Sequence, residues 1–122
     1  MVAGMTGWAV TLPWFPRDLS PNSRAHWRTK AAAAAKYKAD CQYAAMAAGI
    51  RQLPAAALHV SLTFHPPRNA GDLDNMLAAM KSGLDGIAAA SGVDDRHWSI
   101  TIKRGAKQKG GAVHVEITEA TA

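Results

Sequence analysis

The sequence is poor in cysteine, aromatic residues and acidic residues: its 122 residues include one Cys, two Phe, two Tyr and nine Asp or Glu. The single Cys41 has no internal disulfide partner, which indicates a reducing compartment. No apolar run approaches the roughly 20 residues of a membrane span, so we expect no membrane partner. Residues 1–5 lack the charged and apolar segments of a signal peptide, which favours a cytoplasmic protein.

The few acidic residues are distributed unevenly along the chain. Residues 1–71 carry eight Lys and Arg against two Asp, whereas residues 72–122 carry six Lys and Arg against seven acids. The formal net charge of +5 favours an acidic partner, with nucleic acid ahead of an anionic membrane. An acidic island in a basic chain is the pattern expected of a divalent metal site that serves a phosphate backbone.

The length and the ordinary globular composition predict one domain over residues 1–122. Apolar and polar residues alternate, as in half-buried strands, at residues 8–14, 58–65, 98–103 and 113–117. Helical patterns run from Lys30 to about Ala48 and onward from about Asp74. The order β-α-β-α-β-β predicts an α+β fold with two layers, in which two helices cover one face of a mixed four-stranded sheet.

Several boundaries follow from local signals. Thr29 is the predicted N-cap of the first helix, and Gly49 the residue that ends it. We expect the second helix to end near Asp85 or Gly86, where glycines weaken it. Residues 104–111, basic and rich in glycine, are predicted to form a hairpin loop between the last two strands.

The early end of the second helix matters because of Asp95. A helix that ran to Ala90 would place Asp95 about 24 Å from Asp74, at 1.5 Å per residue. Four or five residues reach back only about 15 Å. A shared site for Asp74 and Asp95 within one chain therefore requires a helix that ends near Gly86.

Two acidic pairs, Asp72 with Asp74 and Asp94 with Asp95, are the candidate metal ligands. Asp72 and Asp74 point the same way if the chain enters the helix in an extended conformation, which the preceding Pro66-Pro67 and Gly71 favour. Each pair also has a structural interpretation. Aspartate is common at helix starts, where it accepts hydrogen bonds from free N–H groups, and in turns before strands.

Lys81 lies on the same helical stripe as Asp74 and Asp85. A lysine near metal-binding carboxylates can hold a scissile phosphate or orient a water molecule. The alternative is a structural i, i+4 pair with Asp85. The five histidines show no zinc-binding pattern, and those in strands are expected on the polar surface.

The sequence resembles the RusA-type Holliday junction resolvases. The matching features are a strand ending in Thr11-Leu12-Pro13-Trp14, a basic loop rich in Pro and Asn, Asp72-Leu73-Asp74-Asn75 and the later Asp94-Asp95. The resemblance implies a homodimer that uses Mg²⁺, with Mn²⁺ as a plausible substitute. Such an enzyme cuts branched DNA, resolving four-way junctions by paired nicks during recombination and repair.

The resemblance also implies roles for individual residues. Asp72, Asp74 and Asp95 match the catalytic, metal-binding carboxylates. The lysine of the family falls at Ala78, and Lys81, one turn further on, is the predicted replacement. We expect Arg24, Arg28, Lys30 and Arg68 to contact the DNA backbone. His26 and Trp27 are candidates for stacking on bases, and a position in the core is an equal alternative for Trp27. The alternatives are a non-catalytic basic DNA-binding module and a metal-dependent nuclease acting on flaps or RNA.

Overall fold

The computed structural model describes residues 7–69 and 71–120 and has the predicted α+β order. Two short 3₁₀ turns, η1 (Arg17–Leu19) and η2 (Asp95–His97), join the regular elements. In chain order the helices and strands are β1 (Gly7–Pro13), α1 (Trp27–Ala47), β2 (Leu58–His65), α2 (Leu73–Ala79), α3 (Lys81–Ser91), β3 (Trp98–Arg104) and β4 (Ala112–Glu119).

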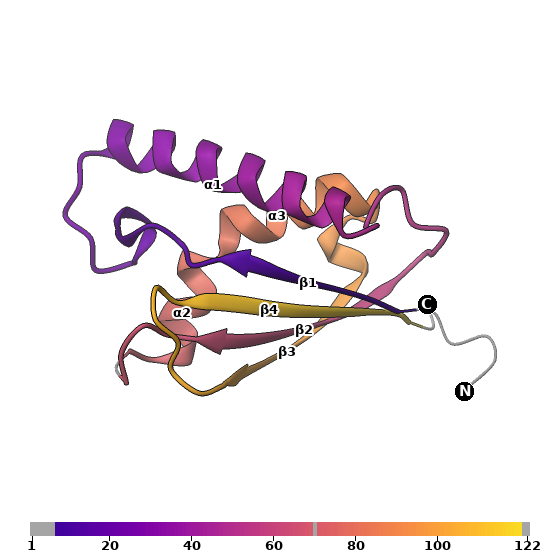
Figure 1. Ribbon diagram of the computed structural model, residues 1–122. Coiled ribbons are helices and arrows are strands. Elements are labelled where there is room, and N and C mark those ends of the chain that lie inside the picture. Colours follow the sequence, from indigo (N-terminus) through magenta and orange to yellow (C-terminus); the bar gives the residue numbers. More distant parts are fainter. Residues whose placement is uncertain (1–6, 70, 121–122) are drawn as a thin grey trace.

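The four strands form one mixed sheet in the order β1-β4-β2-β3. β4 is antiparallel to both of its neighbours, whereas β2 and β3 are parallel. The connection between β2 and β3 runs through α2 and α3, as a parallel pair requires. Figure 1 shows α1 and α3 on one face of the sheet, which confirms the two-layer prediction. Because β2 and β3 are parallel, their C-terminal ends lie at the same edge of the molecule.

The core lies between this sheet and the helices. On β2 the alternate residues Leu58, Val60, Leu62 and Phe64 are fully buried, and their neighbours are half-exposed on the opposite face. The alternation in the sequence therefore predicted the orientation of this strand correctly. Within the described ranges, no helix combines the length and the apolar character needed to cross a membrane.

The predicted hairpin between β3 and β4 is wrong, because β2 lies between these two strands. The connecting loop instead crosses the end of β2. The N–H of Gly105 donates to the carbonyl of Phe64 at 2.8 Å, and the N–H of Gln108 donates to the carbonyl of Pro66 at 2.9 Å. A loop of this length fits either connection, so the sequence alone did not distinguish them.

The first helix begins at Trp27, three residues before the predicted start at Lys30. His26 occupies the N-cap position, and its Nδ1 accepts a hydrogen bond from the N–H of Arg28 at 3.1 Å. Thr29, the predicted cap, lies inside the first turn. The known preference for small polar residues at the N-cap therefore predicted Thr29, whereas the cap is His26. At the other end Gly49 has φ +91°, as predicted for the residue that ends this helix.

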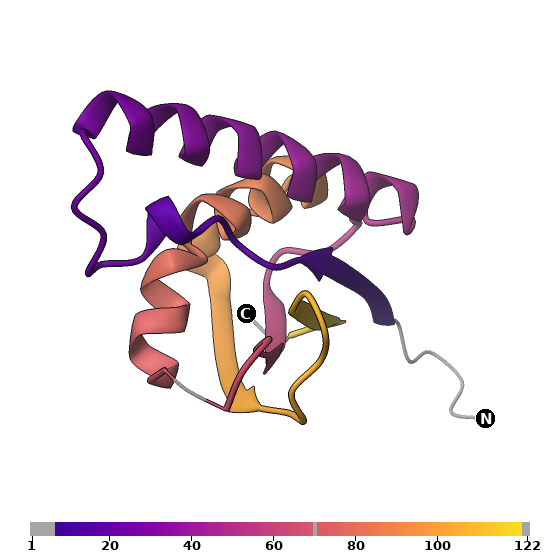
Figure 2. The same cartoon turned by 60° about the vertical axis from the view of Figure 1, so that its left-hand side comes forward.

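The predicted early end of the second helix is also wrong. The helix breaks at Met80, and α3 continues past both glycines to Ser91. Figure 2 shows that α2 and α3 run in different directions. Gly83 and Gly86 face α1 instead of ending a helix. A Cβ atom on Gly86 would collide with the backbone carbonyl of Lys38 and lie 3.0 Å from the backbone nitrogen of Gln42.

We expect Gly86→Ala to destabilise the protein by about 1–3 kcal/mol, because the added methyl group forces α3 away from α1. This loss opposes the gain of about 1 kcal/mol that alanine brings to a helix. Urea unfolding measures the difference. The control is Gly7→Ala, where the new Cβ would lie 3.5 Å from the nearest atom and little change is expected. Unchanged or increased stability of Gly86→Ala would contradict the close helix contact.

Candidate functional site

The first acidic pair lies at the start of α2, exposed to solvent. Gly71 has φ +95°, and Asp72 is extended with φ −98° and ψ 145°, as predicted for the entry into this helix. Asp72 occupies the N-cap position, yet its side chain makes no capping hydrogen bond. Asp74 follows in the first turn. The carboxylate of Asp72 is therefore not used as a helix cap.

Asp72 lies between two hollows that contain arginine. Asp72 lines a small hollow of its own. A larger neighbouring hollow, of about 620 Å³, is lined in part by Arg17 and Arg24, and the two hollows share Ser20 and Asn22. On its other side, the hollow of Asp72 shares Trp14 and Gly71 with a third one that includes Arg68. The start of α2 thus carries free carboxylate groups within a basic surface.

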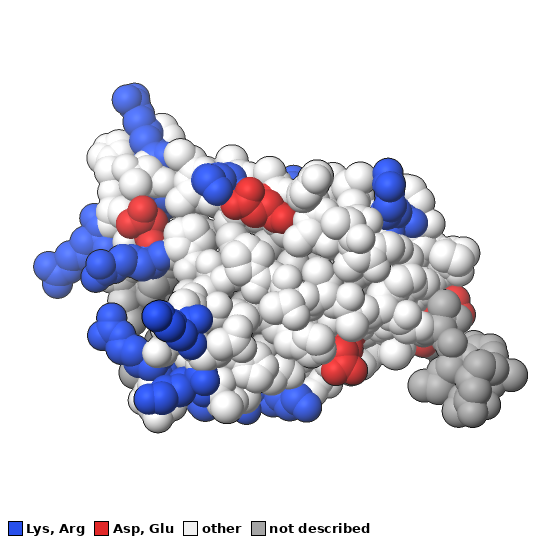
Figure 3. Space-filling view, in the orientation of Figure 1, with Lys and Arg blue, Asp and Glu red and all other residues white. Residues whose placement is uncertain are grey.

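A further arginine reaches the same place from the sheet. The guanidinium group of Arg104, at the end of β3, donates a hydrogen bond to the carbonyl of Gly71. Figure 3 shows Lys and Arg side chains gathered at one end of the molecule, where β2 and β3 end in Figure 1. Sequence reasoning did not select Arg17 or Arg104 as site residues. For Arg104 the reason is that only the parallel pairing of β2 with β3 brings the end of β3 to the start of α2.

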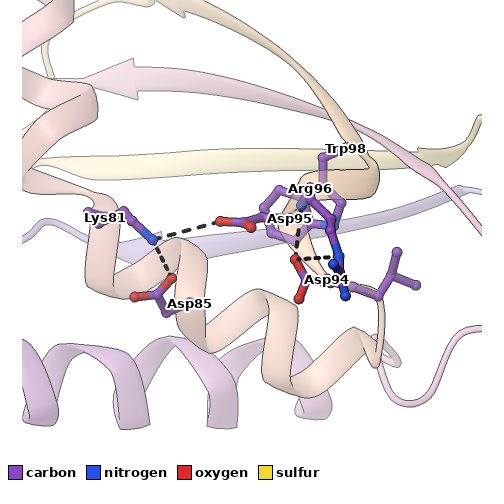
Figure 4. A network of polar contacts seen from close by, with 7 residues as sticks. Lys81, Asp85, Asp94, Asp95, Arg96 and Trp98 are labelled. Carbon is purple, nitrogen blue, oxygen red and sulfur yellow. Dashed lines mark hydrogen bonds and ion pairs between the residues drawn. The ribbon is translucent and has the colours of Figure 1, made fainter.

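The second acidic group surrounds Lys81 at the start of α3 (Figure 4). The ammonium group of Lys81 donates to Asp85 Oδ1 at 2.7 Å, so the predicted i, i+4 pair is present. Asp95 Oδ2 lies 3.7 Å from the same nitrogen. Both contacts are exposed, with 65% of the Lys81 side chain accessible. Lys38 of α1 lines the hollow that these residues share.

Asp94 and Asp95 have different environments. Asp94 caps η2: its Oδ1 accepts a hydrogen bond from the N–H of Arg96 at 3.0 Å. This bond is the main reason that the pKa of Asp94 lies below its ordinary value. The indole of Trp98 donates to the carbonyl of Val93 at 3.0 Å and fixes the same turn. Asp94 therefore has a structural role in the turn before β3, whereas the carboxylate of Asp95 faces Lys81.

The charge of Lys81 is stabilised by its neighbours. The hydrogen bond that Lys81 donates to Asp85 is the largest of the effects that raise the pKa of Lys81. Burial opposes it, and the charges of Asp85 and Asp95 add to the increase. Lys81 is consequently protonated at neutral pH. Its chemistry in this fold is that of a fixed cation and not of a general base.

The two acidic groups remain separate. Among residues 7–69 and 71–120, no three His, Cys, Asp or Glu side chains are close enough together to hold one metal ion. Asp72 lines one hollow and Asp95 another. The break at Met80 also interrupts the predicted stripe, leaving Lys81 and Asp85 paired while Asp74 belongs to a different helix.

The predicted DNA-contacting residues lie around the start of α1 and the end of β2. Arg24, His26, Arg28 and Arg68 are exposed, and Lys30 is half-buried. Trp27 is 67% exposed, so its alternative role as a core residue is excluded. Two of the strand histidines bond to side chains on the outer face of the sheet, as predicted: His59 contacts Ser99 and Thr101, and His114 contacts Thr11.

Comparison with known proteins identifies one similar sequence without a stated function. A protein from Xylella fastidiosa, described as an uncharacterized protein, is 42% identical over 94 residues. The match covers 74% of this chain and 61% of the relative, so the chain spans less than two thirds of that protein. No protein-family model matches the chain. The resemblance to the junction resolvases therefore stays a prediction.

The contacts of Lys81 lead to a pH prediction. We expect Asp85→Asn to lower the pKa of Lys81 toward the ordinary value of 10.5, and Asp95→Asn to lower it less. Because the pKa of Lys81 is raised in the folded state, its ion pairs stabilise the fold fully below pH 10.5 and lose this effect as the pH rises through the raised value. NMR titration of the lysine side-chain nitrogen measures both shifts. Asp40→Asn, on α1, is the control, and an equal shift in all three variants would contradict the assignment.

Proposed function

We propose that this protein is a Mg²⁺-dependent endonuclease that cuts branched DNA, with four-way junctions as its substrate. The observation that carries the proposal is the position of Asp72: its carboxylate makes no capping bond and lies between hollows lined by Arg17 and Arg24 on one side and Arg68 on the other. A basic surface with uncommitted carboxylates at its centre suits a phosphodiester backbone that brings a hard divalent cation.

Asp72 and Asp74 fit a magnesium ion by their chemistry, since both are exposed carboxylates and neither has an ion-pair partner among the described residues. Mn²⁺ would suit the same oxygen ligands. A metal ion bound there supplies Lewis-acid activation of water and charge stabilisation at the phosphate.

In this proposal, cationic side chains bind the phosphate groups of the DNA. Arg24 and Arg68 are placed to bind phosphates on either side of Asp72, and Arg104 holds the backbone of Gly71 immediately before it. Lys81, kept protonated by Asp85 and Asp95, offers a positive charge at the far side of the helix break. Paired nicks in opposite strands require two such sites, and we therefore propose that the protein works as a homodimer.

We expect Asp74→Asn to lower the cleavage rate of a four-way junction in Mg²⁺ by about 100-fold or more, because it removes charge from the metal-binding pair. Binding of the same junction without metal should stay equal or improve. Asp40→Asn, which changes an exposed aspartate on α1, is the matched control. Unchanged cleavage by Asp74→Asn would eliminate the proposed site, whereas absence of cleavage by the wild type would leave the alternative of a non-catalytic basic DNA-binding module.

Asp95 is the third metal ligand that the resemblance implies, yet its carboxylate here contacts Lys81. We expect Asp95→Asn to reduce cleavage no more than Lys81→Met, and less than Asp74→Asn, because it removes only the longer of the two ion pairs of Lys81 and leaves the lysine charged. The same junction assay compares the three variants. A loss as large as that of Asp74→Asn would show that Asp95 joins Asp72 and Asp74 when substrate and metal bind.

The substrate of the proposed nuclease can be identified by comparing cleavage rates on different nucleic acids. Cleavage rates on four-way junctions, flaps, linear duplex and RNA, measured with one enzyme preparation, rank the candidates. The proposal requires the junction to be cut fastest. Faster cutting of flaps or RNA would retain the metal-dependent nuclease and replace its substrate.

A further inference from the structure

The segment from Arg17 to Trp27 combines an arginine-lined hollow with an exposed tryptophan. The hollow, of about 620 Å³, is lined by Arg17 and Arg24 together with hydroxyl and amide side chains. Trp27 follows only two residues after Ala25, the last residue of its wall. Two residues of chain span at most about 7 Å. The backbone of Trp27 therefore lies within about 7 Å of a wall that carries positive charge and hydrogen-bonding groups.

Trp27 is the exposed member of the four tryptophans. It is 67% accessible, whereas Trp8, Trp14 and Trp98 are half-buried. A large aromatic ring left in water at a basic surface is a feature of sites that stack on a partner. Trp8, Trp14 and Trp98 pack against the core, whereas the Trp27 ring does not.

Contacts with its neighbours hold this ring in place. The His26 ring lies 5.7 Å from the Trp27 ring with an interplanar angle of 31°, and the capping bond from the N–H of Arg28 fixes the His26 side chain. The guanidinium carbon of Arg28 lies 5.3 Å from the centre of the Trp27 ring. These contacts order the ring before any ligand binds, which reduces the entropic cost of stacking.

The wall of the hollow suits a phosphate group. Arg17 and Arg24 supply two guanidinium groups against the single carboxylate of Asp18, so the wall is net positive. Ser20 and Ser23 already bond to the backbone N–H groups of their own loop, which keeps the loop in one conformation. Bases in a duplex expose only their edges, whereas an unpaired base offers a face for stacking.

We infer that the segment from Arg17 to Arg28 binds an unpaired nucleotide of DNA, with the phosphate in the arginine-lined hollow and the base on Trp27. This inference rests on the proposed function for the choice of DNA, and it adds the structural feature recognised: single-stranded nucleotides at a branch point. The same hollow shares Ser20 and Asn22 with the hollow of Asp72, so a strand held there leads directly to the proposed cleavage site.

The test is metal-free binding of the full chain to fluorescently labelled dT12 and to a 12-base-pair duplex, measured by anisotropy in EDTA. Trp27→Ala should weaken dT12 binding about 5- to 150-fold, the range found for loss of one base-stacking contact, and leave duplex binding within about twofold. Trp27→Phe, which keeps a stacking face, should retain most of the affinity. Tyr43→Ala is the matched control, since Tyr43 is a 77% exposed aromatic residue on the same helix.

Two further measurements separate the parts of the site. Arg24→Gln should reduce the salt dependence of dT12 binding by roughly 0.7 in the log–log slope, as expected for one lost phosphate contact on a single strand, whereas Arg51→Gln should not. Tryptophan fluorescence of the wild type should be quenched by dT12, and this quenching should be lost in Trp27→Phe.

Equal weakening of dT12 and duplex binding by Trp27→Ala, or no weakening of either, would overturn the inference, as would tighter binding of U12 than of dT12. Because these measurements contain no metal, they do not depend on cleavage. Loss of the Trp27 effect with cleavage intact refutes this site alone. Full cleavage by Asp74→Asn with the Trp27 effect intact refutes the proposed metal site alone, and absence of Mg²⁺-dependent cleavage by the wild type with the Trp27 effect intact refutes the proposed nuclease function alone.

Discussion

The close contact between α1 and α3 is the constraint on which the rest of the molecule depends. Gly83 and Gly86 have no side chains, so the backbone of α3 lies directly against Lys38 and its neighbours on α1. To reach this position the second helical segment changes direction at Met80. The glycines thus lower the intrinsic stability of the helix but allow a packing that larger residues exclude.

The change of direction at Met80 divides the acidic residues into two groups with different electrostatics. Asp72 and Asp74 stay at the start of α2 among arginines from the β1–α1 loop, the end of β2 and the end of β3. Asp85 and Asp95 form ion pairs with Lys81 at the start of α3, beside Lys38. Free carboxylates in a positive field suit metal and phosphate binding, whereas the paired carboxylates chiefly hold a lysine in its charged form.

The basic end of the molecule is assembled from segments that are distant in sequence. The parallel pairing of β2 with β3 brings Arg68 and Arg104 to one edge, and β1 ends at the same side and leads into the loop with Arg17 and Arg24. Trp27 extends this surface at the start of α1. Basic side chains, exposed carboxylates and an exposed aromatic ring therefore occur on neighbouring segments, and the proposed binding of branched DNA rests on this combination.

The sequence by itself determined the class of fold, the strands, and the buried faces of β1, β2 and β4, because alternation with a period of two reflects which side of a strand meets the core. The same alternation in β3 does not correspond to a buried face, since Ile100 is 42% exposed. The sequence also located Asp72 at an extended helix start and paired Lys81 with Asp85, since both depend on residues within one turn. Only the tertiary structure decided the crossing of β2 by the loop after β3, the helix start at Trp27, the role of Gly83 and Gly86, and the separation of Asp95 from Asp72. These depend on contacts between segments far apart in the chain, and the local pattern is the same whether a glycine ends a helix or packs against another one.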